Sequence, residues 1–136
     1  LIIGSSYISL TLFFILTALY SCMSLPMYSL TIAHTNDFLE QNEIVAYMRI
    51  LPENISYKEV SMGRIVTSSS YRGTGLGKEL MEQGLLFSEK TFGKQAIRIS
   101  AQSHLVRFYS AFGFESTGKE YLEDDIPHTE MLRSTL

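Results

Sequence analysis

The chain has 136 residues, which is enough for one domain with a hydrophobic core and too few for two. Fourteen acidic residues against eleven basic ones give a formal net charge of −3, so no basic field exists that would hold nucleic acid non-specifically. The single cysteine, Cys22, excludes a disulfide framework and a cysteine-rich metal site, and the three widely separated histidines (His34, His104 and His128) show no metal-ligand spacing.

The beginning of the chain differs sharply from the rest. No Asp, Glu, Lys or Arg occurs before Asp37, so all 25 charges fall in the last 100 residues. One quarter of the residues in this later part are therefore charged, which is the usual share for a globular domain. We therefore divide the chain into an uncharged apolar segment of doubtful nature, residues 1–30, and a folded domain, residues 31–136, which we expect to be cytoplasmic.

Three interpretations of the apolar segment stay open. Residues 1–25 run without a charge for longer than the ~20 residues that span a bilayer, so a membrane helix or signal segment is the first. Against it, the basic region of a signal peptide is missing, and Ser and Thr recur. The second is a buried apolar start of the domain. The third is a stretch foreign to the domain, such as a frame-shifted start; without an initiating methionine, the chain could also be a fragment.

Strand patterns come first within the domain. Residues 28–33 and 43–51 are rich in β-branched and aromatic side chains, and the polar stretch between them predicts an antiparallel hairpin. Residues 52–59, with a proline and an asparagine, are typical of a turn. A third strand is expected from about Val60 to Ser68.

Helical periodicity follows three closely spaced glycines and predicts an amphipathic helix that ends near Gly93. Gly84 inside this helix costs about 1 kcal/mol relative to alanine, so we expect close packing at that position. Residues 96–102 predict a short strand with apolar side chains on one face. A second helix follows, with Ser103 as its expected N-cap and Gly113 as its C-terminal stop.

Two further strands are expected near the end of the chain. They lie near residues 114–121 and 129–134, and they flank a loop over residues 122–128.

The glycines lie in YRGTGLGKEL, residues 71–80, between a strand and a helix. A helix N-terminus offers unpaired N–H groups and a partial positive charge, glycines let a ligand approach, and Arg72 can fork onto phosphate oxygens. A tight turn that needs glycine only for geometry is the alternative; three glycines with an arginine favour phosphate. A nucleoside-triphosphate loop does not fit, because only three residues separate Gly73 from Gly77. The dinucleotide fingerprint fails because Lys78 stands where its third glycine belongs.

The pattern that does fit is Arg72-x-x-Gly75-x-Gly77, which resembles the acetyl-CoA pyrophosphate loop of the GCN5-related N-acetyltransferases (GNAT). RFYSAFGF, residues 107–114, is similar to the family's late helix and its exit into the next strand. GRIVTSSSYRGTGLGKELM, ISAQSHLVRFYSAFGF and YLEDDIPHTEM, in this order, resemble the ElaA-like branch over roughly residues 33–134. The resemblance implies an α/β (α+β) fold with a mixed, mostly antiparallel sheet, a splayed central strand and flanking helices.

The resemblance also implies where acetyl-CoA binds. The backbone of Ile65, Val66 and Thr67 would pair with the pantetheine arm in the V between the splayed strands. Gln102 stands where many members have an asparagine that contacts the cofactor arm. Backbone N–H groups would hold the pyrophosphate along the loop, which comprises Arg72, Gly73, Thr74, Gly75, Leu76, Gly77 and Lys78.

Two residues carry the implied catalysis. Tyr109 matches the family's tyrosine near the CoA sulfur, where a phenol can protonate the departing thiolate; ordinary core packing is its alternative role. His128 resembles a recurrent feature of the ElaA-like branch and is the candidate general base, with a structural hydrogen bond as the alternative. Glu59 and Glu123 are weaker candidates for the base.

The implied reaction is direct transfer of an acetyl group to an amine, which belongs to a small molecule or a protein. Backbone N–H groups beside the splayed strand would stabilise the oxyanion, and the absence of cysteine after Asp37 argues against a covalent cysteine intermediate. No nucleic acid or metal is expected, and a homodimer is left open. The competing functions are a non-catalytic acyl-CoA-binding module of the same fold and a membrane-anchored protein with a functional apolar N-terminus.

The front of the chain departs from the family. Members begin with a strand and two helices that build much of the acceptor pocket, usually with charged faces. Residues 1–30 do not resemble these elements, so we expect the N-terminal strand and helices to be missing or replaced and the enzyme to be impaired.

Overall fold

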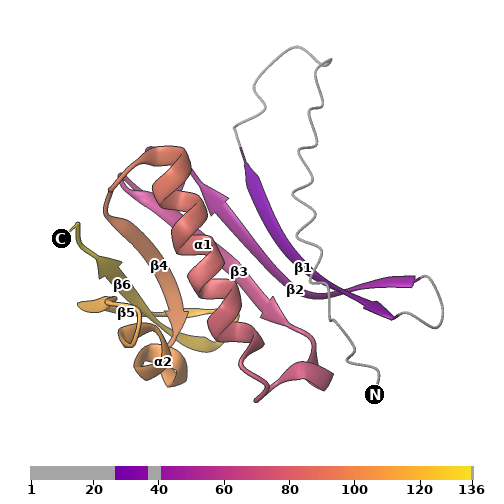
Figure 1. Ribbon diagram of the computed structural model, residues 1–136. Helices are drawn as coiled ribbons and strands as arrows, with labels where there is room; N and C mark the ends of the chain where they lie inside the picture. Colours follow the sequence, from indigo (N-terminus) through magenta and orange to yellow (C-terminus); the bar gives the residue numbers. More distant parts are fainter. Residues whose placement is uncertain (1–26, 37–40, 136) are drawn as a thin grey trace, which may run out of the picture.

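The computed structural model describes residues 27–36 and 41–135 (Figure 1). The apolar segment, to which the three interpretations apply, lies outside these residues except for its last four. No helix in the described part of the chain is both long and apolar enough to cross a membrane.

One six-stranded sheet organises the molecule, in the order β1-β2-β3-β4-β6-β5. Every neighbouring pair is antiparallel except β3 and β4, which confirms the expected mixed, mostly antiparallel sheet. The elements are β1 (Tyr28–Asn36), β2 (Gln41–Leu51), β3 (Val60–Thr67), the 3-10 turn η1 (Ser69–Tyr71), α1 (Leu76–Phe92), β4 (Ile97–Gln102), the 3-10 turn η2 (Ser103–Leu105), α2 (Val106–Ser110), β5 (Glu115–Glu123) and β6 (Ile126–Arg133).

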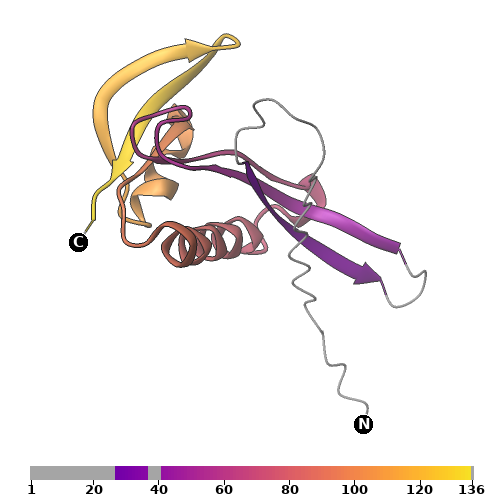
Figure 2. The ribbon, with the colours of Figure 1, turned by 90° about the horizontal axis from the view of Figure 1, so that it is seen from above.

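Helix α1 covers one face of the sheet (Figures 1 and 2). Its buried side chains, Leu76, Leu80 and Met81 among them, pack on the strands, as the periodicity predicted. A Cβ built on Gly84 would lie 2.5 Å from Met48 Sδ, because the side chain of Met48 on β2 fills the space beside this glycine. The expectation of close packing at Gly84 is confirmed.

The second half of the sheet carries the short helix α2. Buried side chains alternate along β4 at Ile97, Ile99 and Ala101, as predicted. The expected N-cap role of Ser103 is wrong: the segment opens with a 3-10 turn, and Ser103 Oγ lies 2.9 Å from Thr129 Oγ1 on β6, a partner that sequence spacing cannot reveal.

The expected seven-residue loop between the last two strands is instead a tight hairpin. Strands β5 and β6 are joined by two residues, Asp124 and Asp125, with φ of 50° and 60°. Two consecutive left-handed residues are the geometry of a type I′ turn, which aspartate tolerates. Glu123 and His128 are therefore strand residues held in register, and Figure 2 shows this hairpin and β1–β2 at opposite ends of the sheet.

An ionic cluster fastens the two halves of the sheet. Arg98 on β4 donates from Nε and Nη2 to the two oxygens of Glu59, both at 2.8 Å, and from Nη1 to Glu130 Oε1 on β6 at 2.5 Å. Lys119 Nζ on β5 lies 3.3 Å from Glu130 Oε2. Glu59 directly precedes β3, so the cluster crosses the place where β3 and β4 pair.

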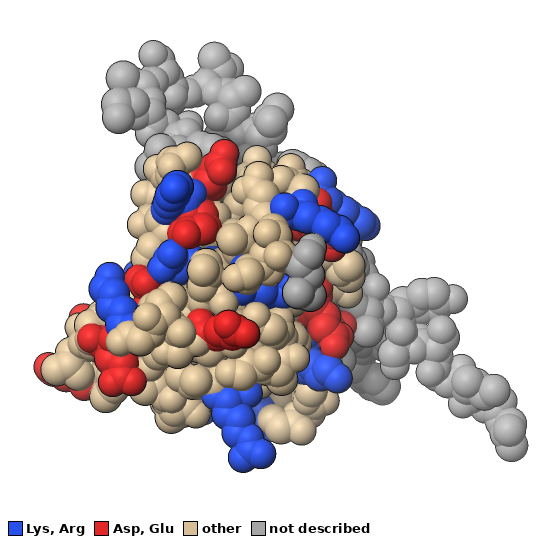
Figure 3. All heavy atoms as spheres, turned by 90° about the vertical axis from the view of Figure 1, so that its left-hand side faces the viewer, with Lys and Arg blue, Asp and Glu red and all other residues tan. Residues whose placement is uncertain are grey.

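Surface charge shows no large field of one sign on the face drawn in Figure 3, where acidic and basic side chains are interspersed.

Candidate active site

Strands β3 and β4 separate after a short parallel pairing. Only Val60, Ser61 and Met62 pair with β4, opposite Ile97, Arg98 and Ile99. Beyond this point β3 stays with β2, and β4 stays with β6. The facing edge of β3, from residue 63 to 67, therefore has no neighbouring strand in the described structure, and a V opens between the two halves of the sheet.

A bulge in β3 accounts for the separation. The register between β2 and β3 shifts by one residue between Tyr47 and Arg49, and Arg64 has a φ of 54°. Such a bulge bends its strand and increases the local twist. The last residues of β3 therefore turn away from β4, while the pairing with β2 is kept.

The glycine loop lies where β3 leads into α1 (Figure 1). Gly73 and Gly75 have φ of 80° and 92°, values that side chains rarely adopt, so the loop needs glycine at both positions. Gly75 is the N-cap of α1, and the N–H of Glu79 bonds to its carbonyl at 3.1 Å. The N–H groups that precede Glu79 in the first turn are left for a ligand, as at any helix start.

The loop lies close to α2 and to the end of β3. A Cβ on Gly77 would lie 3.8 Å from Phe108 Cζ on α2 and 3.9 Å from Thr67 Cγ2 at the end of β3. Arg72 is exposed, and no ion pair involves it in the described part of the chain. The N-terminus of α1 therefore exposes backbone amides and the guanidinium of Arg72 next to the open end of the V.

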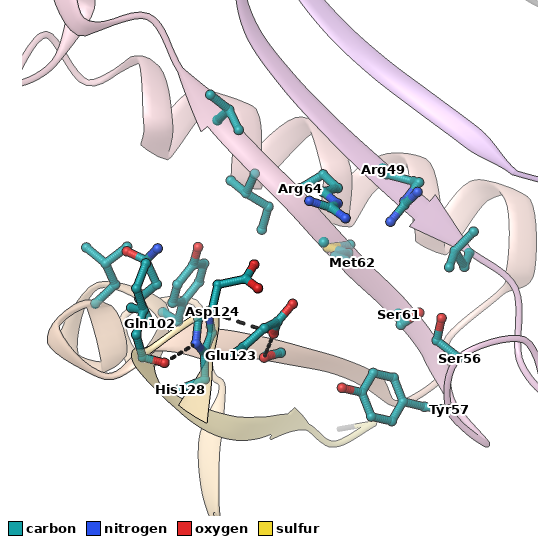
Figure 4. A pocket seen from close by; sticks show the side chains of 18 of the residues that line it. Arg49, Ser56, Tyr57, Ser61, Met62, Arg64, Gln102, Glu123, Asp124 and His128 are labelled. Carbon is teal, nitrogen blue, oxygen red and sulfur yellow. Dashed lines mark hydrogen bonds and ion pairs between the residues drawn. The ribbon is translucent and has the colours of Figure 1, made fainter. Parts of the chain in front are cut away.

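A cavity of about 650 Å³ occupies the V and the adjoining sheet face (Figure 4). Arg49 lines it, whereas Met48, the preceding residue on β2, packs toward α1. Because successive side chains of a strand point to opposite faces, the cavity lies on the face that α1 does not cover. It has the volume of a typical small-molecule site.

Tyr109 on α2 lines this cavity. Its side chain is only 6% exposed and packs edge-on against Phe108 and Phe114. Burial raises the pKa of the Tyr109 phenol above 10, so the hydroxyl stays protonated at neutral pH. Tyr109 is therefore a core aromatic that also lines the cavity and keeps its hydroxyl protonated.

His128 on β6 also lines the cavity, with its side chain 12% exposed. Its Nδ1 is 2.9 Å from the carbonyl oxygen of Ile126. A carbonyl only accepts, so Nδ1 carries the proton and Nε2 of the neutral ring is left as a base. Nε2 lies 4.0 Å from Glu123 Oε2, whose side chain is 55% exposed.

Hydroxyl groups extend this polar wall, and the sequence analysis missed them. Tyr121 stacks on His128 and donates a hydrogen bond to Ser100 Oγ, which lies 3.5 Å from Glu123 Oε2. Tyr57 also lines the cavity, and burial together with its hydrogen bond to Tyr121 raises its pKa to about 12. These residues come from three separate segments, so no spacing motif marks them.

The predicted site residues thus fall into three groups. Ile65, Val66, Gln102, Tyr109, His128 and Glu123 line one cavity. Thr67 and the loop from Arg72 to Lys78 lie outside its lining, at the mouth of α1. Glu59 is held by Arg98, whose hydrogen bond lowers the pKa of Glu59 to about 2, which makes it a poor base.

Comparison with known structures identifies this architecture as that of the acyl-CoA N-acyltransferases. A crystal structure of an acyl-CoA N-acyltransferase from Pseudomonas aeruginosa matches with a TM-score of 0.67 and 37% identity, over 79% of this chain and 69% of that chain. The crystal structure of Escherichia coli ElaA matches with a TM-score of 0.65 and 32% identity, over the same shares of the two chains.

The chain belongs to the acetyltransferase (GNAT) domain family, whose model matches residues 26–134. By sequence it is 35% identical to ElaA of Escherichia coli over 97 residues, or 71% of this chain and 63% of that protein. It is 37% identical to a UPF0039 protein of Synechocystis over 98 residues, or 72% of this chain and 61% of the relative. The chain therefore spans about three fifths of the length of these curated relatives, and the resemblance to the ElaA-like branch is confirmed.

Proposed function

We propose that the protein is an N-acetyltransferase that moves the acetyl group of acetyl-CoA to an amine by direct attack. The observation that carries this proposal is that β3 separates from β4 next to the glycine-rich N-terminus of α1. An unpaired strand edge can take up the amide groups of an extended ligand, and a helix N-terminus can take up its phosphates. A pantetheine arm that ends in a pyrophosphate has both features.

The two ends of acetyl-CoA would contact different parts of the chain. The backbone of Ile65, Val66 and Thr67 holds the pantetheine, and the segment from Arg72 to Lys78 holds the pyrophosphate. Gln102, at the end of β4, faces the arm from the other side of the V. The acetyl group then lies in the cavity between Tyr109 and His128, which both line it.

The chemistry needs one group that accepts a proton and one that donates a proton. His128 Nε2 accepts a proton from the acceptor ammonium. The free amine attacks the thioester carbon, the carbonyl oxygen takes up the negative charge, and free amides of β3 stabilise that oxyanion. The C–S bond then breaks, the protonated Tyr109 phenol supplies the proton to the thiolate, and the proton that the attacking nitrogen must lose restores the phenol.

Binding of acetyl-CoA tests the first half of the proposal. Acetyl-CoA should raise the melting temperature of the wild-type protein, because a ligand that binds only the folded state stabilises it. The Arg72→Ala, Gly75→Glu double variant should lose this rise, whereas Arg107→Ala, an exposed change on α2, should retain it. An equal rise in all three proteins would contradict the placement of the pyrophosphate.

Turnover tests the second half. Thiol release from acetyl-CoA in the presence of an amine panel should be slowed about 10²-fold or more by His128→Gln, and at high pH, where the acceptor is already neutral, the loss should shrink. Tyr109→Phe should lower kcat with little change in the affinity for acetyl-CoA. Binding without turnover by the wild-type protein would instead identify a non-catalytic acyl-CoA-binding module.

A further inference from the structure

Two arginines lie on one wall of the cavity without an acidic partner. Arg49 on β2 and Arg64 at the bulge of β3 both line it. In the described part of the chain neither forms an ion pair, and the one side-chain hydrogen bond of either guanidinium runs from Arg49 Nη1 to Met27 Sδ at 3.8 Å. Neither belongs to the proposed acetyl-CoA loop or to the proton-transfer residues.

The backbone brings these two side chains together. Arg49 pairs with Gly63, so Arg64 follows directly after the residue opposite Arg49. Regular alternation would send the side chain of Arg64 to the other face of the sheet, but the bulge re-aims it. Figure 4 shows both guanidinium groups directed into the cavity from the same wall.

The opposite wall carries negative charge. Glu123 and Asp124, at the end of the β5–β6 hairpin, line the cavity beside His128, and Figure 4 shows their carboxylates across the space from the arginines. The cavity therefore has a cationic wall and an anionic wall. Two guanidinium groups on one wall repel each other unless an anion lies between them, and their planar donor forks fit an oxyanion well.

We propose that the acceptor is a small amine that also carries an oxyanion group, a carboxylate or a phosphate, which Arg49 and Arg64 bind while the amine lies at His128 and Glu123. This inference rests on the proposed acetyltransferase function and adds the substrate class. A cavity of about 650 Å³ holds a small molecule that spans both walls. Diamines and polyamines, which place a second cation against the arginines, are disfavoured by the same geometry.

Matched acceptor pairs test this substrate class. ε-Aminocaproate and its amide differ only in the carboxylate, and phosphoethanolamine and ethanolamine differ only in the phosphate. Each compound is tested as an acceptor by kcat/KM and as a ligand of the CoA-saturated protein by calorimetry. The proteins are the wild type, Arg49→Gln, Arg64→Gln and, as the control, Arg107→Gln.

The wild type and the control should favour the anionic member of at least one pair by about tenfold or more, which is the usual contribution of a charge-assisted hydrogen bond. Arg49→Gln and Arg64→Gln should each bring this ratio close to one and leave the neutral member unchanged. The pair that shows the preference identifies the oxyanion as carboxylate or phosphate.

Two outcomes overturn the inference: equal binding of both members by the wild type, or a preference that survives in both variants. Acetylation without any anionic preference refutes the substrate class and leaves the acetyltransferase intact. An anionic preference in calorimetry without turnover refutes the transferase and leaves the anion site intact.

Discussion

Replacement of Arg98 by methionine should destabilise the protein strongly. The change keeps much of the side-chain volume but removes three hydrogen bonds, two to Glu59 and one to Glu130. The side chain of Glu130 is 8% exposed and that of Glu59 is 21% exposed, so both carboxylates would be left in poorly solvated positions. Lys119 still neutralises one oxygen of Glu130, whereas Glu59 has no other ion-pair partner in the described structure.

The size of the loss follows from this geometry. Removing one partner of a buried ion pair costs about 3–5 kcal/mol, and the partial exposure of Glu59 places the expected loss at about 3 kcal/mol. Urea unfolding of a domain this size has a slope of about 1.5–2 kcal/mol per molar. The midpoint should therefore fall by about 1.5–2 M with an unchanged slope. The exposed change Arg107→Met should stay within about 0.5 kcal/mol of the wild type.

The pH dependence provides an independent measurement. The hydrogen bond from Arg98 lowers the pKa of Glu59 from 4.5 to about 2, so its contribution to stability is present above pH 4.5 and is lost as the pH falls toward 2. The difference in unfolding free energy between wild type and Arg98→Met should therefore shrink on acidification from pH 5 toward pH 2.5.

Neutralising the stranded carboxylates should recover part of the loss. The triple variant Arg98→Met, Glu59→Gln, Glu130→Gln no longer buries unpaired charge, so it should be more stable than Arg98→Met alone. A loss below about 1 kcal/mol for Arg98→Met, or a loss that does not change with pH, would refute the reasoning, because it would mean that the cluster behaves as an ordinary surface ion pair.

Three further substitutions test the packing by the same urea titration. Gly84→Ala should lower the stability by about 1 kcal/mol, because the clash with Met48 Sδ at 2.5 Å outweighs the gain in helix propensity, and a Met48→Leu background should reverse the sign. Ser88→Ala should raise the stability by about 1 kcal/mol, since this 3% exposed serine has an Oγ without a hydrogen-bond partner among the described residues. Gly113→Ala should cost about 1–2 kcal/mol, because this glycine has a φ of 83°; no loss would mean that the left-handed turn after α2 is dispensable.

Most of the fold could be predicted because hydrophobic periodicity and glycine placement are local signals. The two hairpin strands, the third strand, the long helix and the strand at residues 96–102 are confirmed within a few residues. Gly93 ends α1 at a φ of 77°, and Gly113 follows α2 at 83°, as expected of helix stops. These signals need no knowledge of partners distant in sequence.

The errors occur where a distant partner or an unusual turn decides the structure. Ser103 looks like an N-cap in isolation, but its hydroxyl finds Thr129 on another strand. The stretch around Asp124 and Asp125 is polar enough to resemble a loop, yet two left-handed aspartates close a hairpin without the usual glycine. Local composition cannot distinguish these cases.

The site residues likewise divide into those that a local motif or the family resemblance could mark and those that only the fold brings together. The loop from Arg72 to Lys78 is contiguous, so a motif could find it, and Tyr109 and His128 were marked by the family resemblance. Arg49, Tyr57 and Tyr121 reach the cavity from separate strands and turns. Only the strand order and register bring them together, and neither is encoded in any short stretch of sequence.

Two structural features, one at each end of the β3–β4 pairing, determine how widely the V opens. A parallel pairing of three residues is a weak connection, and without restraint the two halves of the sheet would either pair further or part altogether. The bulge at Arg64 prevents further pairing, because the twist it adds carries the end of β3 away from β4. The bidentate bond from Arg98 to Glu59 prevents parting, because it joins β4 to the residue before β3 at the closed end. The width of the cleft is therefore fixed by the backbone and by a shielded ion pair, so a ligand finds unpaired amides already in place and little of its binding energy is spent on opening the sheet.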